Sequence, residues 1–196
     1  MAARDGMTNM IQTLRSMTNA GATDYAIGLV DYWSDDQLQA ALDAHRMDFY
    51  QADLAQITAM ESGAVVWKTY RSPYRNLEGG TVNFTVIDGL GNVAGTADYS
   101  ADYPNGIITF SANQAGKIWY LTARAYDIYA AAADVWRMKA AHASAEFDFT
   151  TDNHSIKGSQ LSAQCLKMAD YYERRSMMSS LNVTGGHSVL IDRSDT

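Results

Sequence analysis

The stretch SDDQLQAALDAHRMDF, residues 34–49, contains the clearest helix start in the chain. Ser34 and Gln37 have the spacing of a capping box, in which the hydroxyl accepts from the Gln37 amide and the Gln37 side chain reaches back. Two aspartates follow in the first turn, where the helix dipole favours negative charge. One face of the helix would carry Leu38, Ala41, Leu42, His45 and Phe49. This spacing predicts a helix that runs to about residue 58 with one buried face.

Three other segments also show helical spacing of apolar residues. Residues 7–19 do so before the stop signal Asn19-Ala20-Gly21. Residues 122–146 form an alanine-rich run with one aromatic face, and residues 157–176 place Cys165 on an apolar face. The chain is therefore expected to contain two pairs of helices.

Between these pairs the hydrophobic period changes to two. β-branched and aromatic runs occupy residues 65–70, 81–87, 107–110 and 117–121, and turns such as Pro104-Asn105-Gly106 separate them. Together the patterns predict a mainly α protein, a four-helix bundle with a small inserted antiparallel β region and an extended C-terminal arm. The expected parts are residues 1–62 (N-terminal helical pair), 63–121 (β-rich insertion), 122–178 (C-terminal helical pair) and 179–196 (arm).

The net charge of −7 lies entirely in the first part of the chain. Residues 1–116 carry 6 basic and 13 acidic side chains, whereas residues 117–196 carry 9 of each. Between Asp24 and Glu61, eight carboxylates are accompanied by Arg46 alone among basic residues. Proteins that grip a nucleic-acid backbone have the opposite sign of charge. Tight DNA binding is therefore disfavoured, although a pore through which DNA slides could use this repulsion.

The sequence contains no recognisable catalytic, cofactor or metal motif. Gly89, Gly91 and Gly95 miss the dinucleotide-binding spacing by one residue, and the chain has no phosphate-binding loop. None of the four histidines pairs with another His or Cys at metal-ligand spacing. Cys165 is the one cysteine, and its place on an apolar helix face favours a core residue. We expect no enzyme, no cofactor and no bound metal, and no apolar run is long enough to predict a membrane span.

Three pairs of segments resemble the head-to-tail connector, or adaptor, family of tailed bacteriophages. They are LRSMTNA (14–20) with YWSDDQLQ (32–39), GIITF (106–110) with YLTARAYDIYAAAA (120–133), and AEFDFTTDN (145–153) with SQ (159–160). The resemblance spans about two-thirds of the chain and leaves out residues 60–100 and the C-terminal arm.

The resemblance implies a structural protein of the virion. Connector subunits are mostly α-helical and form a ring, commonly of twelve, beneath the portal at the capsid vertex. The ring extends the DNA channel and docks the neck or tail, and its subunits are not enzymes. The expected partners are copies of this chain, the portal protein and a neck or tail completion protein, while DNA passes through without tight binding. We expect synthesis in the host cytoplasm and a final location at the head–tail junction.

Two sets of residues are candidates for these roles. The acidic residues that could line the channel are Asp35, Asp36, Asp43, Asp48 and Asp53. By position, the arm corresponds to the family's segment that reaches the portal or a neighbouring subunit. Its apolar residues are Leu181, Val183, Val189, Leu190 and Ile191.

Two alternative functions remain open. The chain could be a different virion protein, such as a neck stopper or tail-completion protein, although stoppers are usually β-rich. It could also be a carbohydrate- or peptide-binding module on the β region, because exposed aromatic side chains stack on sugars. The candidate aromatics are Trp67, Tyr70, Tyr74 and Trp119.

Overall fold

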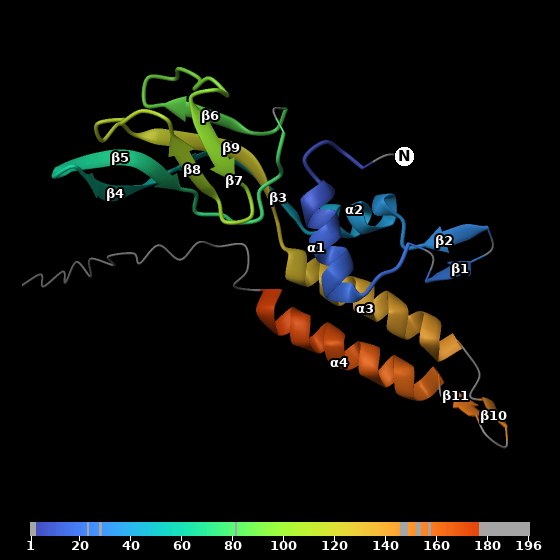
Figure 1. The fold of residues 1–196 in the computed structure, drawn as a ribbon. Helices are drawn as coiled ribbons and strands as arrows, with labels where there is room; N and C mark the ends of the chain where they lie inside the picture. The colour runs from blue at the N-terminus through green and yellow to red at the C-terminus, as the bar shows by residue number, and fades with distance from the viewer. Residues whose placement is uncertain are drawn as a thin grey trace, which may run out of the picture.

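A computed structural model shows a helical part joined to a β part (Figure 1). It describes residues 3–22, 24–27, 29–80, 82–145, 149–151, 154–156 and 158–176. The helices in these residues are α1 (Thr8–Thr18), α2 (Asp35–Asp43), α3 (Ile128–Ala145) and α4 (Gly158–Ser176). The expectation of a mainly α bundle is wrong. Helices make up 36% of the structure and strands 32%, so the protein has an α+β fold.

The strands in the described residues form two larger antiparallel sheets and two hairpins. One sheet has the order β3-β9-β6, from Arg46–Asp53, Trp119–Tyr126 and Thr85–Asp88. The other has the order β4-β5-β8-β7, from Ala55–Glu61, Ala64–Arg71, Ile107–Phe110 and Tyr99–Asp102. The hairpins are β1-β2 (Tyr25–Ile27 and Val30–Tyr32) and β10-β11 (Phe149–Thr151 and His154–Ile156).

The second helix is much shorter than its sequence pattern predicted. Both halves of the capping box at Ser34 are present, so its predicted start is confirmed. However, α2 ends at Asp43, and residues 46–53 are strand β3, paired with β9. Phe49, expected on the helical stripe, packs against the β core. Tertiary pairing thus overrides a weak local preference, because β9 supplies hydrogen-bond partners that a continued helix would not use.

The third helix also begins later than predicted. Residues 122–126 belong to β9, where alternate side chains from Trp119 to Ala125 point into the β core. Asp127 then starts α3, because its side chain accepts hydrogen bonds from the backbone N–H groups of Tyr129 and Ala130. The predicted α1, the predicted α4 and the turn at residues 104–106 between β7 and β8 are confirmed.

Two hydrophobic cores lie side by side. The helical core gathers α1, α2, the first half of α3 and Trp33, whereas the β core lies between the two sheets. Strands β3 and β4 follow each other directly in the chain, separated by the buried Leu54. The Leu54 N–H donates to the Trp119 carbonyl of β9. Before Leu54, β3 pairs with β9, and after it β4 pairs with β5, so the chain passes from one sheet to the other at this residue.

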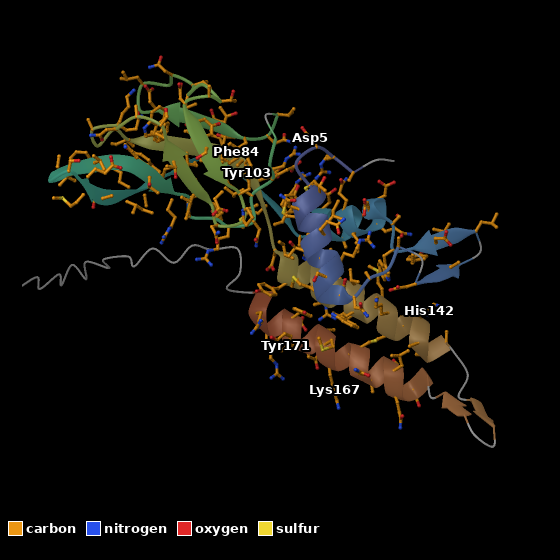
Figure 2. All side chains as sticks on the ribbon, viewed as in Figure 1. Asp5, Phe84, Tyr103, His142, Lys167 and Tyr171 are labelled. Carbon is orange, nitrogen blue, oxygen red and sulfur yellow. The ribbon has the colours of Figure 1, made fainter. Side chains whose placement is uncertain are left out.

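Helix α4 packs against α3 as an antiparallel partner, and the β10-β11 hairpin lies in the connection between them (Figure 1). Only Cys165 and Ala169 of α4 are buried among its described side chains. Figure 2 shows Lys167 and Tyr171 on the side of α4 away from α3. Within the described part of the chain, no helix has the length and apolar character needed to cross a bilayer.

Replacing Ser34 by Ala should destabilise the protein by about 1 kcal/mol, because the Gln37 N–H loses its side-chain acceptor. Urea unfolding followed by circular dichroism measures this change. Ser34→Asp retains an acceptor and serves as the control, so equal losses for the two variants would contradict the capping role.

Candidate functional site

The five acidic channel candidates do not form one row. Asp35 and Asp36 lie in the first turn of α2 and Asp43 at its end, so the helix separates the two groups by about 12 Å. Asp48 and Asp53 lie on β3 and are exposed. Their role in lining a channel stays a prediction.

Three of these carboxylates pair with arginines of the same chain. Asp35 binds Arg15 at 2.7 Å, and Asp43 binds Arg4 through two hydrogen bonds of 2.7 and 2.6 Å. Asp48 lies 2.9 Å from Arg46 and 3.5 Å from Arg124. Arg4, Arg15 and Arg124 lie outside the acidic run in the sequence. The fold therefore compensates part of the negative charge that the sequence concentrates there.

The remaining candidates from the sequence lie elsewhere in the structure. Leu181, Val183, Val189, Leu190 and Ile191 lie outside the described residues. Tyr70 and Trp119 are buried in the β core, and Tyr70 donates its hydroxyl to the Lys117 carbonyl. Tyr74 is half-buried and its ring lies 4.5 Å from that of Phe49. The aromatic candidates thus form no common exposed platform for a sugar.

A buried carboxylate joins the helical part to the β part. Glu78 is 1% exposed and accepts the Tyr126 hydroxyl hydrogen bond at 2.6 Å. The guanidinium of Arg4 donates to Glu78 at 3.2 Å and to the Tyr126 oxygen at 2.9 Å, and Arg124 lies 3.5 Å from Glu78. We call Glu78, Tyr126, Arg4, Arg124 and Asp43 the Glu78 network. It connects the N-terminal segment, the end of α2, β9 and the segment after β5.

Burial and hydrogen bonding shift the pKa values of Tyr126 and Asp43 in this network. Desolvation is the main cause of the raised pKa of Tyr126, and the hydrogen bond to Glu78 raises this pKa further. The hydrogen bonds from Arg4 hold the pKa of Asp43 below its usual value. The phenol thus stays protonated and donates, while Asp43 stays ionised and accepts. The Tyr126 hydroxyl and the Asp43 carboxylate therefore keep their hydrogen bonds at neutral pH.

A second buried carboxylate orders the loop after β6. Asp88 accepts hydrogen bonds from the N–H groups of Leu90 and Asn92, from the Asn92 side chain and from Lys117. The Lys117 ammonium is the main cause of its lowered pKa, followed by the Asn92 donors. These bonds fix the backbone from residue 88 to 92.

The fixed loop presents apolar side chains to solvent. Leu90 is 85% exposed, Val93 66% and Ile118 56%. The Gly89 N–H donates to the Ile118 carbonyl, and Val93 bridges to Ile87. We call Leu90, Val93 and Ile118 the apolar tip. Exposed apolar groups gathered in a patch mark interaction or ligand-binding surfaces.

Two projecting hairpins also carry exposed apolar residues (Figure 1). Leu29 and Val30 are exposed where β1 turns into β2. Met60 and Val65 are exposed and stand directly opposite each other near the end of the β4-β5 hairpin. The described surface therefore offers apolar contacts at several separate projections.

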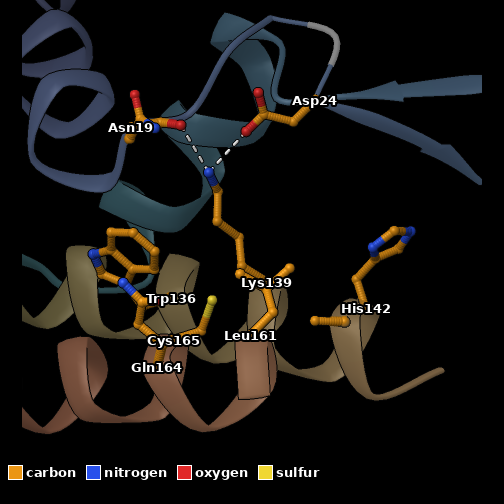
Figure 3. Close-up of a pocket in the computed structure, with 9 residues that line it drawn as sticks. Asn19, Asp24, Trp136, Lys139, His142, Leu161, Gln164 and Cys165 are labelled. Carbon is orange, nitrogen blue, oxygen red and sulfur yellow. Dashed lines mark hydrogen bonds and ion pairs between the residues drawn. The ribbon is translucent and has the colours of Figure 1, made fainter. Parts of the chain in front are cut away.

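A cavity of about 390 Å³ lies between α3, α4 and the segment after α1 (Figure 3). The Lys139 ammonium donates to the Asn19 carbonyl at 2.8 Å and to Asp24 at 2.7 Å, and it lies 5.4 Å from the Trp136 ring centroid. Cys165 also lines the cavity, and burial raises the pKa of its thiol. A thiol held protonated is a poor nucleophile. Lys139 instead serves to tie α3 to the α1–β1 segment.

Possible metal ligands do not cluster in the part of the chain that the structure describes. The side chain of His45 lies 2.6 Å from Asp134 of α3, which satisfies one ring nitrogen. Sequence reasoning identified neither Glu78 nor Asp88, because no local pattern distinguishes a carboxylate that a distant arginine or lysine will partner.

Replacing Tyr126 by Phe should lower the free energy of unfolding by about 1–3 kcal/mol, because buried Glu78 loses a hydrogen-bond donor. Urea unfolding measures the loss. Tyr120→Phe, on the other face of β9, is the control and should change stability by less than about 0.5 kcal/mol. Wild-type stability in Tyr126→Phe would show that the hydroxyl contributes nothing.

The stabilisation from Asp43 should depend on pH in the acid range. Its folded pKa is lowered, so the contribution is complete above the unfolded value of about 3.9 and is lost as the pH falls through the lower folded value. Asp43→Asn should therefore be less stable than wild type at pH 7, with the difference shrinking toward pH 3. Chemical unfolding at both pH values tests this. Asp53→Asn controls for the loss of one charge, and identical pH profiles for the two variants would contradict the prediction.

A scan of protein-family models, a search of curated proteins and a search of solved structures found no match to this chain.

Proposed function

We propose that this protein is a non-catalytic structural subunit of a tailed-phage particle. It forms a connector ring below the portal at the head–tail junction, extends the DNA channel and docks the neck or tail. The proposal combines the resemblance of the three segment pairs with one structural observation, the display of exposed apolar side chains on projecting elements.

The projections support an assembling protein for a physical reason. Leaving a large aliphatic side chain in water forgoes about 1.5–3 kcal/mol of burial. Large apolar side chains are left exposed at three places: the apolar tip, the tip of β1-β2 and the tip of β4-β5. Burial against other subunits would recover that free energy. No comparable gain would come from binding a small molecule at three separate projections.

The arrangement also suits head-to-tail contacts. A cyclic ring needs two different, complementary surfaces on each subunit. The β4-β5 and β1-β2 hairpins project from opposite sides of the molecule (Figure 1). One can therefore face the preceding subunit while the other faces the next.

A neck stopper or tail-completion protein is the second candidate. The strand content of 32%, larger than the sequence predicted, favours it more than the sequence did. The location of the chain separates the two functions. A connector contacts the portal directly, whereas a stopper or completion protein lies farther from the capsid.

Changing the β4-β5 tip should impair assembly but not folding. In Met60→Lys/Val65→Glu, the opposite charges face each other across the hairpin and preserve it. We expect a wild-type circular dichroism spectrum and at least a tenfold loss of incorporation into particles, measured by quantitative mass spectrometry of purified virions. Asn9→Glu/Thr13→Lys, on the exposed side of α1, is the matched control.

Electron microscopy of wild-type particles completes the test. Density for this chain in a ring against the portal is the expected result. Density beyond the next neck component would favour the second candidate, and absence of the chain from virions would overturn both.

A further inference from the structure

A cavity of about 520 Å³ lies where the end of α4 meets the loops of the β part. Its lining comes from the segment after β5, the turn between β7 and β8, the start of α3 and the last turn of α4. The residues are Arg75, Asn76, Pro104, Asn105, Tyr129, Arg174 and Arg175. Three of these seven side chains are guanidinium groups and none is a carboxylate.

Concentrated positive charge is unexpected in this chain, whose net charge is −7. Arg75 is about a hundred residues from Arg174 and Arg175 in the sequence, so the fold, and not a basic run, brings them together. All three side chains are exposed. A cavity lined by three guanidinium groups and no carboxylate favours an anion over a cation.

Helix electrostatics explain only part of the cluster. Arg174 and Arg175 lie in the last turn of α4, where the helix dipole stabilises cations. Arg75 belongs to no helix and gains nothing from that dipole. The helix dipole therefore does not account for the place of Arg75 at this cavity.

Neighbouring groups orient the lining. The guanidinium of Arg175 lies over the Tyr171 ring, 4.5 Å from its centroid, which holds it at the end of α4. Asn105 donates to Asp102 and Asn76 donates to the Tyr126 carbonyl, so both loops are held in place. Tyr129 lies in the first turn of α3, where the positive end of the helix dipole favours an anion.

We propose that this cavity binds a phosphate group. Guanidinium groups form paired hydrogen bonds with both carboxylates and phosphates. Three guanidinium groups match the several oxygens and up to two negative charges of a phosphate better than the two oxygens and single charge of a carboxylate. The phosphate can be free or part of a nucleic-acid backbone, and the site does not depend on the proposed place in the virion.

Calorimetric titration of the full-length protein at low ionic strength tests the site. The probes are inorganic phosphate, pyrophosphate and a 20-nucleotide single-stranded DNA. Arg174→Ala/Arg175→Ala should weaken binding of whichever phosphate probe binds wild type by at least tenfold. Arg75→Gln should weaken it from the other side of the cavity without touching α4.

Two further variants test whether loss of binding comes from lost charge, from lost paired hydrogen bonds or from a general change in α4. Arg174→Lys/Arg175→Lys keeps the charge but loses paired hydrogen bonding, so it should bind with intermediate affinity. Lys167→Ala removes a cation from the exposed side of the same helix and should bind as wild type does (Figure 2). Circular dichroism confirms that each variant is folded.

The pattern of binding identifies the source of the phosphate. Binding of inorganic phosphate or pyrophosphate alone assigns a small-anion site, and binding of DNA, with or without them, assigns a backbone contact. Equal affinity of Arg75→Gln, Arg174→Ala/Arg175→Ala and wild type for every probe would overturn the proposal, as would no binding to wild type. Loss of self-association in the arginine variants without any phosphate binding would also overturn it and assign the cluster to carboxylates of a second copy.

Discussion

The buried carboxylate of Glu78 is the constraint on which the joining of the two parts depends. A charge at 1% exposure needs hydrogen bonds and opposite charges, and these come from Tyr126, Arg4 and Arg124. Meeting that need places the N-terminal segment against the β part, and Arg4 then reaches Asp43 at the end of α2. Gly6 completes the contact: its φ is +84°, and an added Cβ would lie 2.0 Å from the Gly79 carbonyl oxygen. One buried carboxylate, together with the close backbone approach that Gly6 allows, thus positions an entire terminal segment.

The joined cores give the projecting elements a rigid base. The chain passes from one sheet to the other at Leu54, between β3 and β4. The side chain of Lys139 holds the α1–β1 segment to α3. The Asp88 bonds order the apolar tip in the same way. Ordering these groups before contact reduces the entropy lost on association. Such preorganisation would suit the proposed role as a subunit of a particle, because each contact between subunits must form in a defined geometry.

Charged side chains that are separated in the sequence are brought together by the fold. The acidic run from Asp24 to Glu61 acquires Arg4, Arg15, Arg124 and Lys139 as partners from other parts of the chain. Meanwhile Arg75, Arg174 and Arg175 gather at one cavity. A DNA channel lined by the acidic residues would therefore be less repulsive than the raw count of carboxylates suggests. The long-range field depends on these pairs, since close opposite charges largely cancel at a distance.

The sequence by itself determined the features that depend on neighbouring residues. Ser34 and Gln37 are three residues apart, so their capping box was predictable, as were α1, α4 and the turn at residues 104–106. Only the tertiary structure decided that residues 46–53 and 122–126 are strands, because their partners lie far away in the chain: Phe49 pairs with Ala123. The same holds for Arg4 with Glu78 and for the arginine cavity. Helix caps and turns are local free-energy terms, whereas strand pairing, buried ion pairs and cavities depend on which distant residues the folded chain brings within hydrogen-bonding reach.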